Sequence, residues 1–231
     1  MIVAANWKMN LNSEYSKELA TSFRSIETDH EMIVFPSILN INEVSTALEG
    51  SQIKVGMQNF YPSEEGSVTG EVSLAQVPKK VEYVMVGHSE RRNLMEETPA
   101  FIKTKLSYAL ESGYKAVLCV GETLEQRRKG KTLAYIGDQL ESCLPGIALF
   151  KQIIVAYEPI WSIGTGIIPK EDELERVASF IKASYNFPVL YGGSVTPENV
   201  SFFTQIPSIS GVLVGGASLE YTKFWKLVRN M

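Results

Sequence analysis

Residues 152–159 read QIIVAYEP, a short apolar run that ends on a glutamate followed by a proline. Seven further runs of this kind recur along the chain, at residues 2–7, 32–37, 53–58, 83–89, 115–121, 187–193 and 211–216. They are rich in valine and isoleucine and mostly lack an alternation of apolar and polar residues. This pattern is typical of parallel strands that are buried on both faces of a sheet.

Amphipathic segments separate most of these runs. Apolar residues at three- and four-residue spacing predict helices over residues 13–27, 98–112, 170–185 and 219–229. Two connections are weaker: residues 60–80 form a polar loop with room for only a short helix after it, and residues 121–151 hold two helical pieces broken at Gly130. The alternation predicts a parallel sheet, because parallel neighbours need a long crossover connection.

Two arrangements of a parallel sheet fit this alternation. A doubly wound open sheet is expected to carry a GxGxxG turn after its first strand, and residues 4–12 read AANWKMNLN instead. Closure of eight strands into a (β/α)8 barrel fits the count better. No proline-rich linker, low-complexity segment or shift in composition marks a boundary, so we expect residues 1–231 to form one domain.

Composition sets limits on partners and compartment. The formal net charge of −4 gives no basic footprint, so we expect neither nucleic acid nor an anionic membrane as a partner, whereas a small anionic substrate stays open. The N-terminus does not resemble a signal peptide, and no apolar run is long enough for a membrane span. Cys119 and Cys143 form no CxxC pair, which favours reduced thiols and the cytoplasm.

In a (β/α)8 barrel the active site lies at the C-terminal ends of the strands, so polar residues there are candidates. Asn6 and Lys8 follow the first run and point to the same face if the strand continues. The fourth run ends in GHSERR (87–92), and a helix starting there favours a neutral His88. A solvated lysine and a structural histidine are the alternatives, and we interpret Arg92 as part of a salt-bridged surface cluster.

Glu158 is the most informative of these strand-end residues. Pro159 restricts the backbone of the preceding residue, so the carboxylate is held in a fixed direction, as a general base requires. Trp161 offers a bulky anchor, and Gly164 and Gly166 give the segment freedom to move and to approach a ligand closely. The alternative interpretation is a simple turn.

Paired glycines follow the last two runs, in YGGSV (191–195) and VGGAS (214–218). Backbone N–H groups at such points, with a helix N-terminus behind them, bind phosphate. In a (β/α)8 barrel the loops after strands 7 and 8 are the usual phosphate position. Two Gly-Gly pairs in these two places predict a phosphate site.

Six segments taken together are characteristic: NWKMN, GHSERR, CVGE, YEPIWSIGTG, YGGSV and LVGGASL. In this order, from residue 4 to residue 219, they resemble the triosephosphate isomerase family. Enzymes of that family use a glutamate base, a neutral histidine and a loop that closes over the substrate. The resemblance implies interconversion of dihydroxyacetone phosphate and D-glyceraldehyde 3-phosphate through an enediolate, in glycolysis and gluconeogenesis. It also implies a homodimer and neither metal nor organic cofactor.

The resemblance assigns roles to individual positions. Glu158 corresponds to the base that shuttles the proton, and His88 to the neutral electrophile that donates to the substrate oxygens. Lys8 corresponds to the lysine that attracts the anionic substrate, and Asn6 to the amide that hydrogen-bonds its oxygens. Glu90 corresponds to the acidic partner near that lysine.

Three further segments are assigned by the same resemblance. Residues 159–169 correspond to a lid that includes Pro159, Trp161, Gly164 and Gly166. The phosphate grip corresponds to the backbone N–H groups of Gly164, Ser194, Gly215 and Gly216. The loop at 60–73 resembles an arm that inserts into a neighbouring subunit, with Thr69, Gly70 and Glu71.

The chain also departs from the family pattern. It is shorter than the roughly 250 residues typical of the fold. The lid ends in GIIPKED (166–172), with Ile167–Pro169 where a small-residue hinge is expected, and the arm reads NFYPSEEGS (59–67). Two other functions stay open: a metal-dependent pentose phosphate epimerase, for which two histidines are a poor ligand set, and a catalytically silent barrel that binds a sugar phosphate or a protein.

Overall fold

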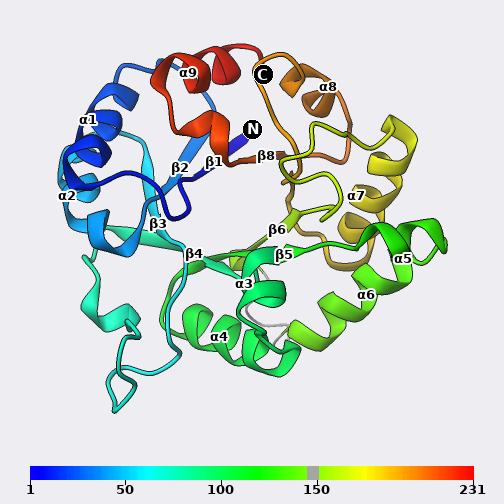
Figure 1. The fold of residues 1–231 in the computed structure, drawn as a ribbon, viewed down its shortest axis with the longest axis horizontal. Helices are drawn as coiled ribbons and strands as arrows, with labels where there is room; N and C mark the ends of the chain where they lie inside the picture. The colour runs from blue at the N-terminus through cyan, green and yellow to red at the C-terminus, as the bar shows by residue number, and fades with distance from the viewer. Residues whose placement is uncertain (145–150) are drawn as a thin grey trace.

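The computed structural model describes residues 1–144 and 151–231. Eight parallel strands pair in chain order and close into a barrel, with β1 hydrogen-bonded to both β2 and β8 (Figure 1). The strands are β1 (Ile2–Asn6), β2 (Glu31–Phe35), β3 (Lys54–Met57), β4 (Val81–Val86), β5 (Lys115–Val120), β6 (Ile153–Tyr157), β7 (Val189–Tyr191) and β8 (Gly211–Val214). The predicted (β/α)8 barrel is confirmed.

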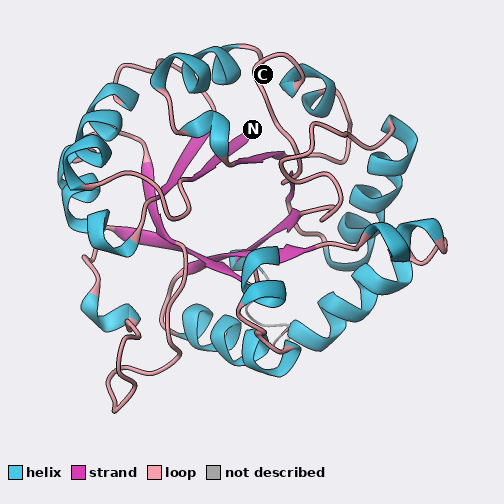
Figure 2. Cartoon of the chain, in the orientation of Figure 1, coloured by secondary structure: helices cyan, strands magenta, loops and turns pink. Residues whose placement is uncertain are grey.

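Helices surround the barrel on its outer face (Figure 2). They are α1 (Ser13–Phe23), α2 (Ile41–Ala47), α3 (Ser89–Leu94), α4 (Pro99–Glu111), α5 (Leu124–Arg128), α6 (Thr132–Cys143), α7 (Glu171–Tyr185), α8 (Val200–Thr204) and α9 (Tyr221–Arg229). The rings of Phe23 and Phe224 stack with centroids 4.5 Å apart, so the first and last helices pack together where the barrel closes. Within the described residues, no helix is long and apolar enough to cross a membrane.

Each strand is buried on both faces, as the uninterrupted apolar runs predict. Along β5, Val117 and Cys119 belong to the cluster inside the barrel, whereas Leu118 belongs to the layer between strands and helices. Phe35 fills part of the interior, and a Cβ at Gly56 would lie 2.3 Å from its ring. The glycine is therefore required for the ring to pack against β3.

The predicted helices agree with the structure apart from their ends. The helix expected over 13–27 ends at Phe23, and Ile26 is buried from the turn that follows, where its N–H bonds the Phe23 carbonyl oxygen. The break at Gly130 lies between α5 and α6, where φ is +68°, and the last part of the segment, 145–150, lies outside the described residues. After the 60–73 loop there is only a 3₁₀ turn, Leu74–Gln76. The short helices α2 and α8 were not predicted, since one or two turns carry little periodicity.

Candidate active site

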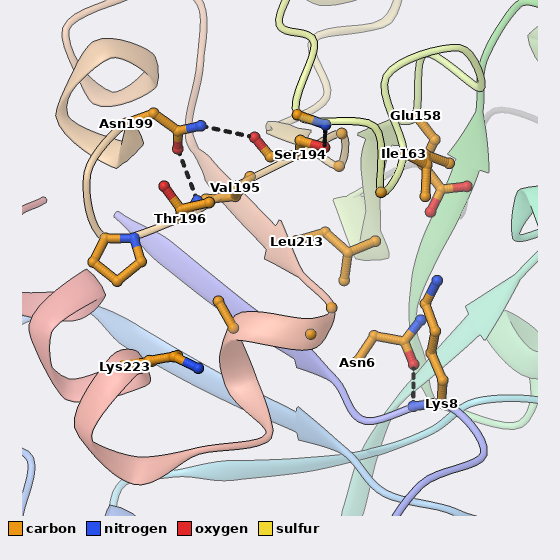
Figure 3. A pocket seen from close by; sticks show the side chains of 18 of the residues that line it. Asn6, Lys8, Glu158, Ile163, Ser194, Val195, Thr196, Asn199, Leu213 and Lys223 are labelled. Carbon is orange, nitrogen blue, oxygen red and sulfur yellow. Dashed lines mark hydrogen bonds between the residues drawn. The ribbon is translucent and has the colours of Figure 1, made fainter.

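A cavity of about 650 Å³ opens at the C-terminal ends of the strands. Its lining includes the predicted residues Asn6, Lys8, His88, Glu158, Gly164, Gly215, Gly216 and Ser194. Figure 3 shows Asn6, Lys8 and Glu158 on one side of this cavity and Ser194 on another. Residues from β1, β4, β6, β7 and β8 are thus brought to one place by closure of the barrel.

Glu158 lies directly after β6 and is only 1% exposed. One carboxylate oxygen, Oε1, lies 3.0 Å from His88 Nε2, and the other, Oε2, accepts the Ser89 backbone N–H at 2.9 Å. A Cβ at position 192 would lie 2.9 Å from Glu158 Cγ, so Gly192 allows the carboxylate to pass close to the strand 7 loop. The carboxylate is therefore fixed by its partners as well as by its backbone.

The hydrogen bonds of His88 indicate its tautomer. Its Nδ1 accepts the backbone N–H of Glu90 at 3.2 Å, which requires a lone pair on that nitrogen. The proton of a neutral imidazole then lies on Nε2, which donates to Glu158. In the neutral form of the ring, this arrangement leaves Nε2 as the N–H donor toward Glu158.

Burial and charge act in opposite directions on this pair. Burial lowers the pKa of His88, but the Glu158 carboxylate and its hydrogen bond outweigh burial and leave that pKa above its ordinary 6.5. Burial raises the pKa of Glu158, whereas His88 and the Ser89 N–H lower it, and the net direction is downward. Glu158 is therefore ionised at neutral pH, the state in which a carboxylate accepts a proton.

Lys8 adopts a left-handed backbone conformation, with φ of 53°, which is uncommon for a residue other than glycine. Its backbone N–H donates to Asn6 Oδ1 at 3.0 Å, and its Nζ lies 2.5 Å from Glu90 Oε1. A Cβ at Gly215 would lie 3.6 Å from Lys8 Cε, so the ammonium stem runs beside the loop after β8. Glu90 does not line the cavity, but it forms an ion pair with Lys8, which does.

Backbone groups make up the far end of the cavity. Gly215 and Gly216 lie where β8 meets the 3₁₀ turn Gly216–Ser218, and Ser194 follows the paired glycines after β7. The Ser194 N–H points at Ser162 Oγ at 3.3 Å, a long contact. This end has the glycine-rich backbone that a phosphate site requires.

The predicted lid, residues 159–169, folds over one edge of the cavity. Gly164 and Gly166 line it and have φ of +70° and +77°, where glycine is strongly favoured. Pro159 and Trp161 do not line it. The Trp161 indole donates to Glu122 Oε1 at 2.9 Å and packs under the guanidinium of Arg127, so this side chain anchors the lid from outside.

Thr69, Gly70 and Glu71 lie away from the cavity. They are exposed residues of the loop that projects from the barrel after β3 (Figure 1). An isolated β-bridge between Tyr61 and Ser73 joins the two ends of this loop. Within this chain, therefore, the arm residues have no contact with the site that they were predicted to approach in a neighbouring subunit.

The sequence interpretation of Arg92 was wrong. Its guanidinium donates to the carbonyl oxygens of Gly87 at 2.8 Å and Cys119 at 2.9 Å, which ties the end of β4 to β5. Arg91 instead makes the salt bridge, to Glu97 at 2.8 Å. The sequence of two adjacent arginines does not show which of them turns inward to bond the carbonyl oxygens at the strand ends.

Several groups around the site were not singled out in the sequence. They are the Ser89 N–H, the Glu122 carboxylate, the Arg127 guanidinium, the Ser162 hydroxyl and the Tyr191 hydroxyl. The motif CVGE contains Glu122, but nothing in the sequence pairs it with Trp161. His30, the second histidine, lies just before β2 at the opposite end of the strands from the cavity.

Fold and site together define a (β/α)8-barrel enzyme with a carboxylate–histidine pair and a lysine beside glycine-rich loops. The family model described as triosephosphate isomerase matches residues 1–231. The chain is 40% identical to the triosephosphate isomerase of Leptospira biflexa, over 99% of this chain and 98% of that protein. It is 36% identical to that of Lawsonia intracellularis, over 99% and 97%. The chain belongs to the triosephosphate isomerase family, a family of isomerases.

The opposed effects on His88 lead to a test by NMR titration. In Glu158→Gln the carboxylate is lost and burial dominates, so the pKa of His88 is expected to move from above 6.5 to below it. Glu90 and Lys8 remain beside the ring and oppose each other. The chain has two histidines, and His30 serves as the internal control whose titration stays unchanged. An unaltered His88 titration would contradict the pairing.

Proposed function

We propose that the protein interconverts dihydroxyacetone phosphate and D-glyceraldehyde 3-phosphate, as its relatives' names indicate for those proteins. The observation that carries the proposal is the ionised, buried Glu158 carboxylate 3.0 Å from His88 Nε2, beside Lys8 and the glycine-rich loops. The substrate phosphate would lie at the N–H groups of Gly164, Ser194, Gly215 and Gly216. The two reacting carbons would then lie toward Glu158.

The reaction requires a base for a weakly acidic carbon-bound proton and a positive environment for the oxygen that becomes negative. Glu158 takes the proton from one carbon and returns it to its neighbour. His88 Nε2–H, the Lys8 ammonium and the Asn6 amide stabilise the developing enediolate. Because Nε2 carries one proton, substrate displaces Glu158 from His88, and this single exchange frees both groups for the reaction.

The lid has two tasks in this mechanism. An exposed enediolate loses its phosphate, and closure both retains the intermediate and strengthens electrostatic interactions by excluding water. Contacts with the phosphate, which lies away from the reacting carbons, supply binding energy for closure. The anchored Trp161 and the left-handed Gly164 and Gly166 suit a segment that is fixed at its root and mobile at its tip.

We also propose that two copies of this chain form a homodimer through the arm at 60–73, with Thr69, Gly70 and Glu71. The arm follows β3, and large exposed apolar side chains follow the two strands that flank β3: Leu39 after β2 and Leu94 after β4, exposed by 84% and 71%. Met9, after β1, is exposed by 95%. Apolar residues gathered around one projecting loop are typical of an interface. We place this dimer in the cytoplasm and treat residues 1–231 as one domain.

Size measurement tests the dimer. At micromolar concentration, size-exclusion chromatography with light scattering is expected to give the mass of two chains of 25.7 kDa each. Leu39→Glu places a charge in the apolar surface and is expected to shift the protein toward a single chain, because a desolvated unpaired charge is unfavourable. Leu124→Glu, on α5, is the control and is expected to leave the size unchanged. A wild-type protein of 25.7 kDa would exclude the dimer.

A direct assay tests the reaction. The purified protein, with a chelator present, is expected to convert D-glyceraldehyde 3-phosphate rapidly. Glu158→Gln is expected to lower kcat by about a thousandfold, the usual range for loss of a general base. Glu141→Gln, at an exposed position of α6, is the matched control and is expected to retain full activity. Absence of conversion by the wild type would favour the catalytically silent barrel.

A further inference from the structure

Ser162 is a fully buried serine within the lid, and its hydroxyl contacts three different segments. Ser162 Oγ lies 2.5 Å from the carbonyl oxygen of Ile167, 2.8 Å from Tyr191 Oη and 3.3 Å from the Ser194 backbone nitrogen. Ile167 belongs to the far end of the lid, Tyr191 to β7, and Ser194 to the candidate phosphate loop. One hydroxyl therefore joins both sides of the lid to the loop that faces the substrate.

Proton counting fixes the direction of each bond. A carbonyl oxygen only accepts, so the single Ser162 hydroxyl proton goes to Ile167. Tyr191 must then donate to Ser162, and the Ser194 N–H donates as well. The serine oxygen thus donates once and accepts twice, which uses its full capacity.

The surroundings are built closely around this oxygen. A Cβ at Gly193 would lie 2.2 Å from Tyr191 Oη and 2.6 Å from Ser162 Oγ, so only glycine leaves space for their hydrogen bond. A second pair of bonds runs in parallel: Ser194 Oγ donates to the Ser162 carbonyl at 2.6 Å and accepts the Gly166 N–H at 3.1 Å.

Ser162 Oγ lies between two groups whose hydrogen-bonding capacities complement its own. Ile167 contributes its carbonyl oxygen, an acceptor, and the Tyr191 hydroxyl has a single proton that a serine oxygen accepts. Ser162 connects the two because a hydroxyl both donates and accepts.

We propose that Ser162 is a positioning residue that latches the lid in its docked position through Tyr191, Ile167 and Ser194. The inference rests on the proposed isomerase function for its catalytic consequence, but not for the latch itself. Ser162 does not line the cavity, so it acts through the lid. Its hydroxyl holds Gly164 and Gly166 over the site and ties the lid to the loop that carries Ser194.

Hydrogen exchange tests the latch without reference to catalysis. In Ser162→Ala the hydroxyl is lost, and the lid amides, Gly166 above all, are expected to exchange roughly five- to tenfold faster, the effect of one net hydrogen bond. Ser16→Ala is the matched control, because Ser16 is equally buried and its hydroxyl accepts from Asn40 at 2.8 Å in a distant part of the barrel. The control is expected to leave lid exchange unchanged.

Product partition tests the catalytic consequence. Ser162→Ala is expected to raise the share of enediolate that loses phosphate to give methylglyoxal, and to lower kcat, each by roughly five- to tenfold. Tyr191→Phe is expected to have a smaller effect in the same direction, because it removes one of the three bonds, and the double variant to be little worse than Ser162→Ala, which already lacks the Tyr191 bond. The melting temperature is expected to change little, because an undocked lid exposes these groups to water.

The outcomes separate the latch from the proposed reaction. Unchanged lid exchange and unchanged partition in an active Ser162→Ala enzyme would overturn the latch and leave the isomerase function standing. Faster lid exchange in Ser162→Ala than in the wild type, together with a wild type that has no isomerase activity, would uphold the latch and overturn the function. Additive effects of Ser162→Ala and Tyr191→Phe would show that the two hydroxyls act separately and would contradict the latch.

Discussion

The contact between the Glu158 carboxylate and His88 Nε2 is the interaction on which the site depends. A carboxylate that is 1% exposed is strongly unfavourable unless it is paired and hydrogen-bonded. His88 Nε2–H and the Ser89 N–H supply these bonds at 3.0 and 2.9 Å, and both come from the segment after β4. The ionised Glu158 carboxylate is therefore stable only where β4 and β6 are held in one closed barrel.

The barrel is shaped around this carboxylate. A Cβ at Gly121 would lie 1.8 Å from the Glu158 carbonyl oxygen, and one at Gly192 would lie 2.9 Å from its Cγ. The glycines of CVGE and YGGSV thus leave space for the backbone and the side chain of Glu158. The same logic applies at Gly193, where the missing side chain leaves space for the Tyr191–Ser162 hydrogen bond.

Much of the architecture was predictable, because β5 and β6 are apolar on both faces and parallel strands require crossovers. The cavity residues were also predictable as a set, since Lys8, His88 and Glu158 all follow strands. Contacts between distant segments were not. The inward turn of Arg92 and the latch at Ser162 depend on side-chain directions across loops, and a serine in a loop has the same local signal whether it is buried or exposed.

In the proposed reaction, Glu158 moves a proton between two adjacent carbons of the substrate. Conversion of dihydroxyacetone phosphate in D₂O, followed by NMR of the product, tests it most directly. A base that exchanges its proton with solvent is expected to leave deuterium on the carbon next to the new carbonyl group, and Glu158→Gln is expected to form almost no labelled product. Rapid conversion by the Glu158→Gln variant, with the same deuterium content, would contradict this role of Glu158.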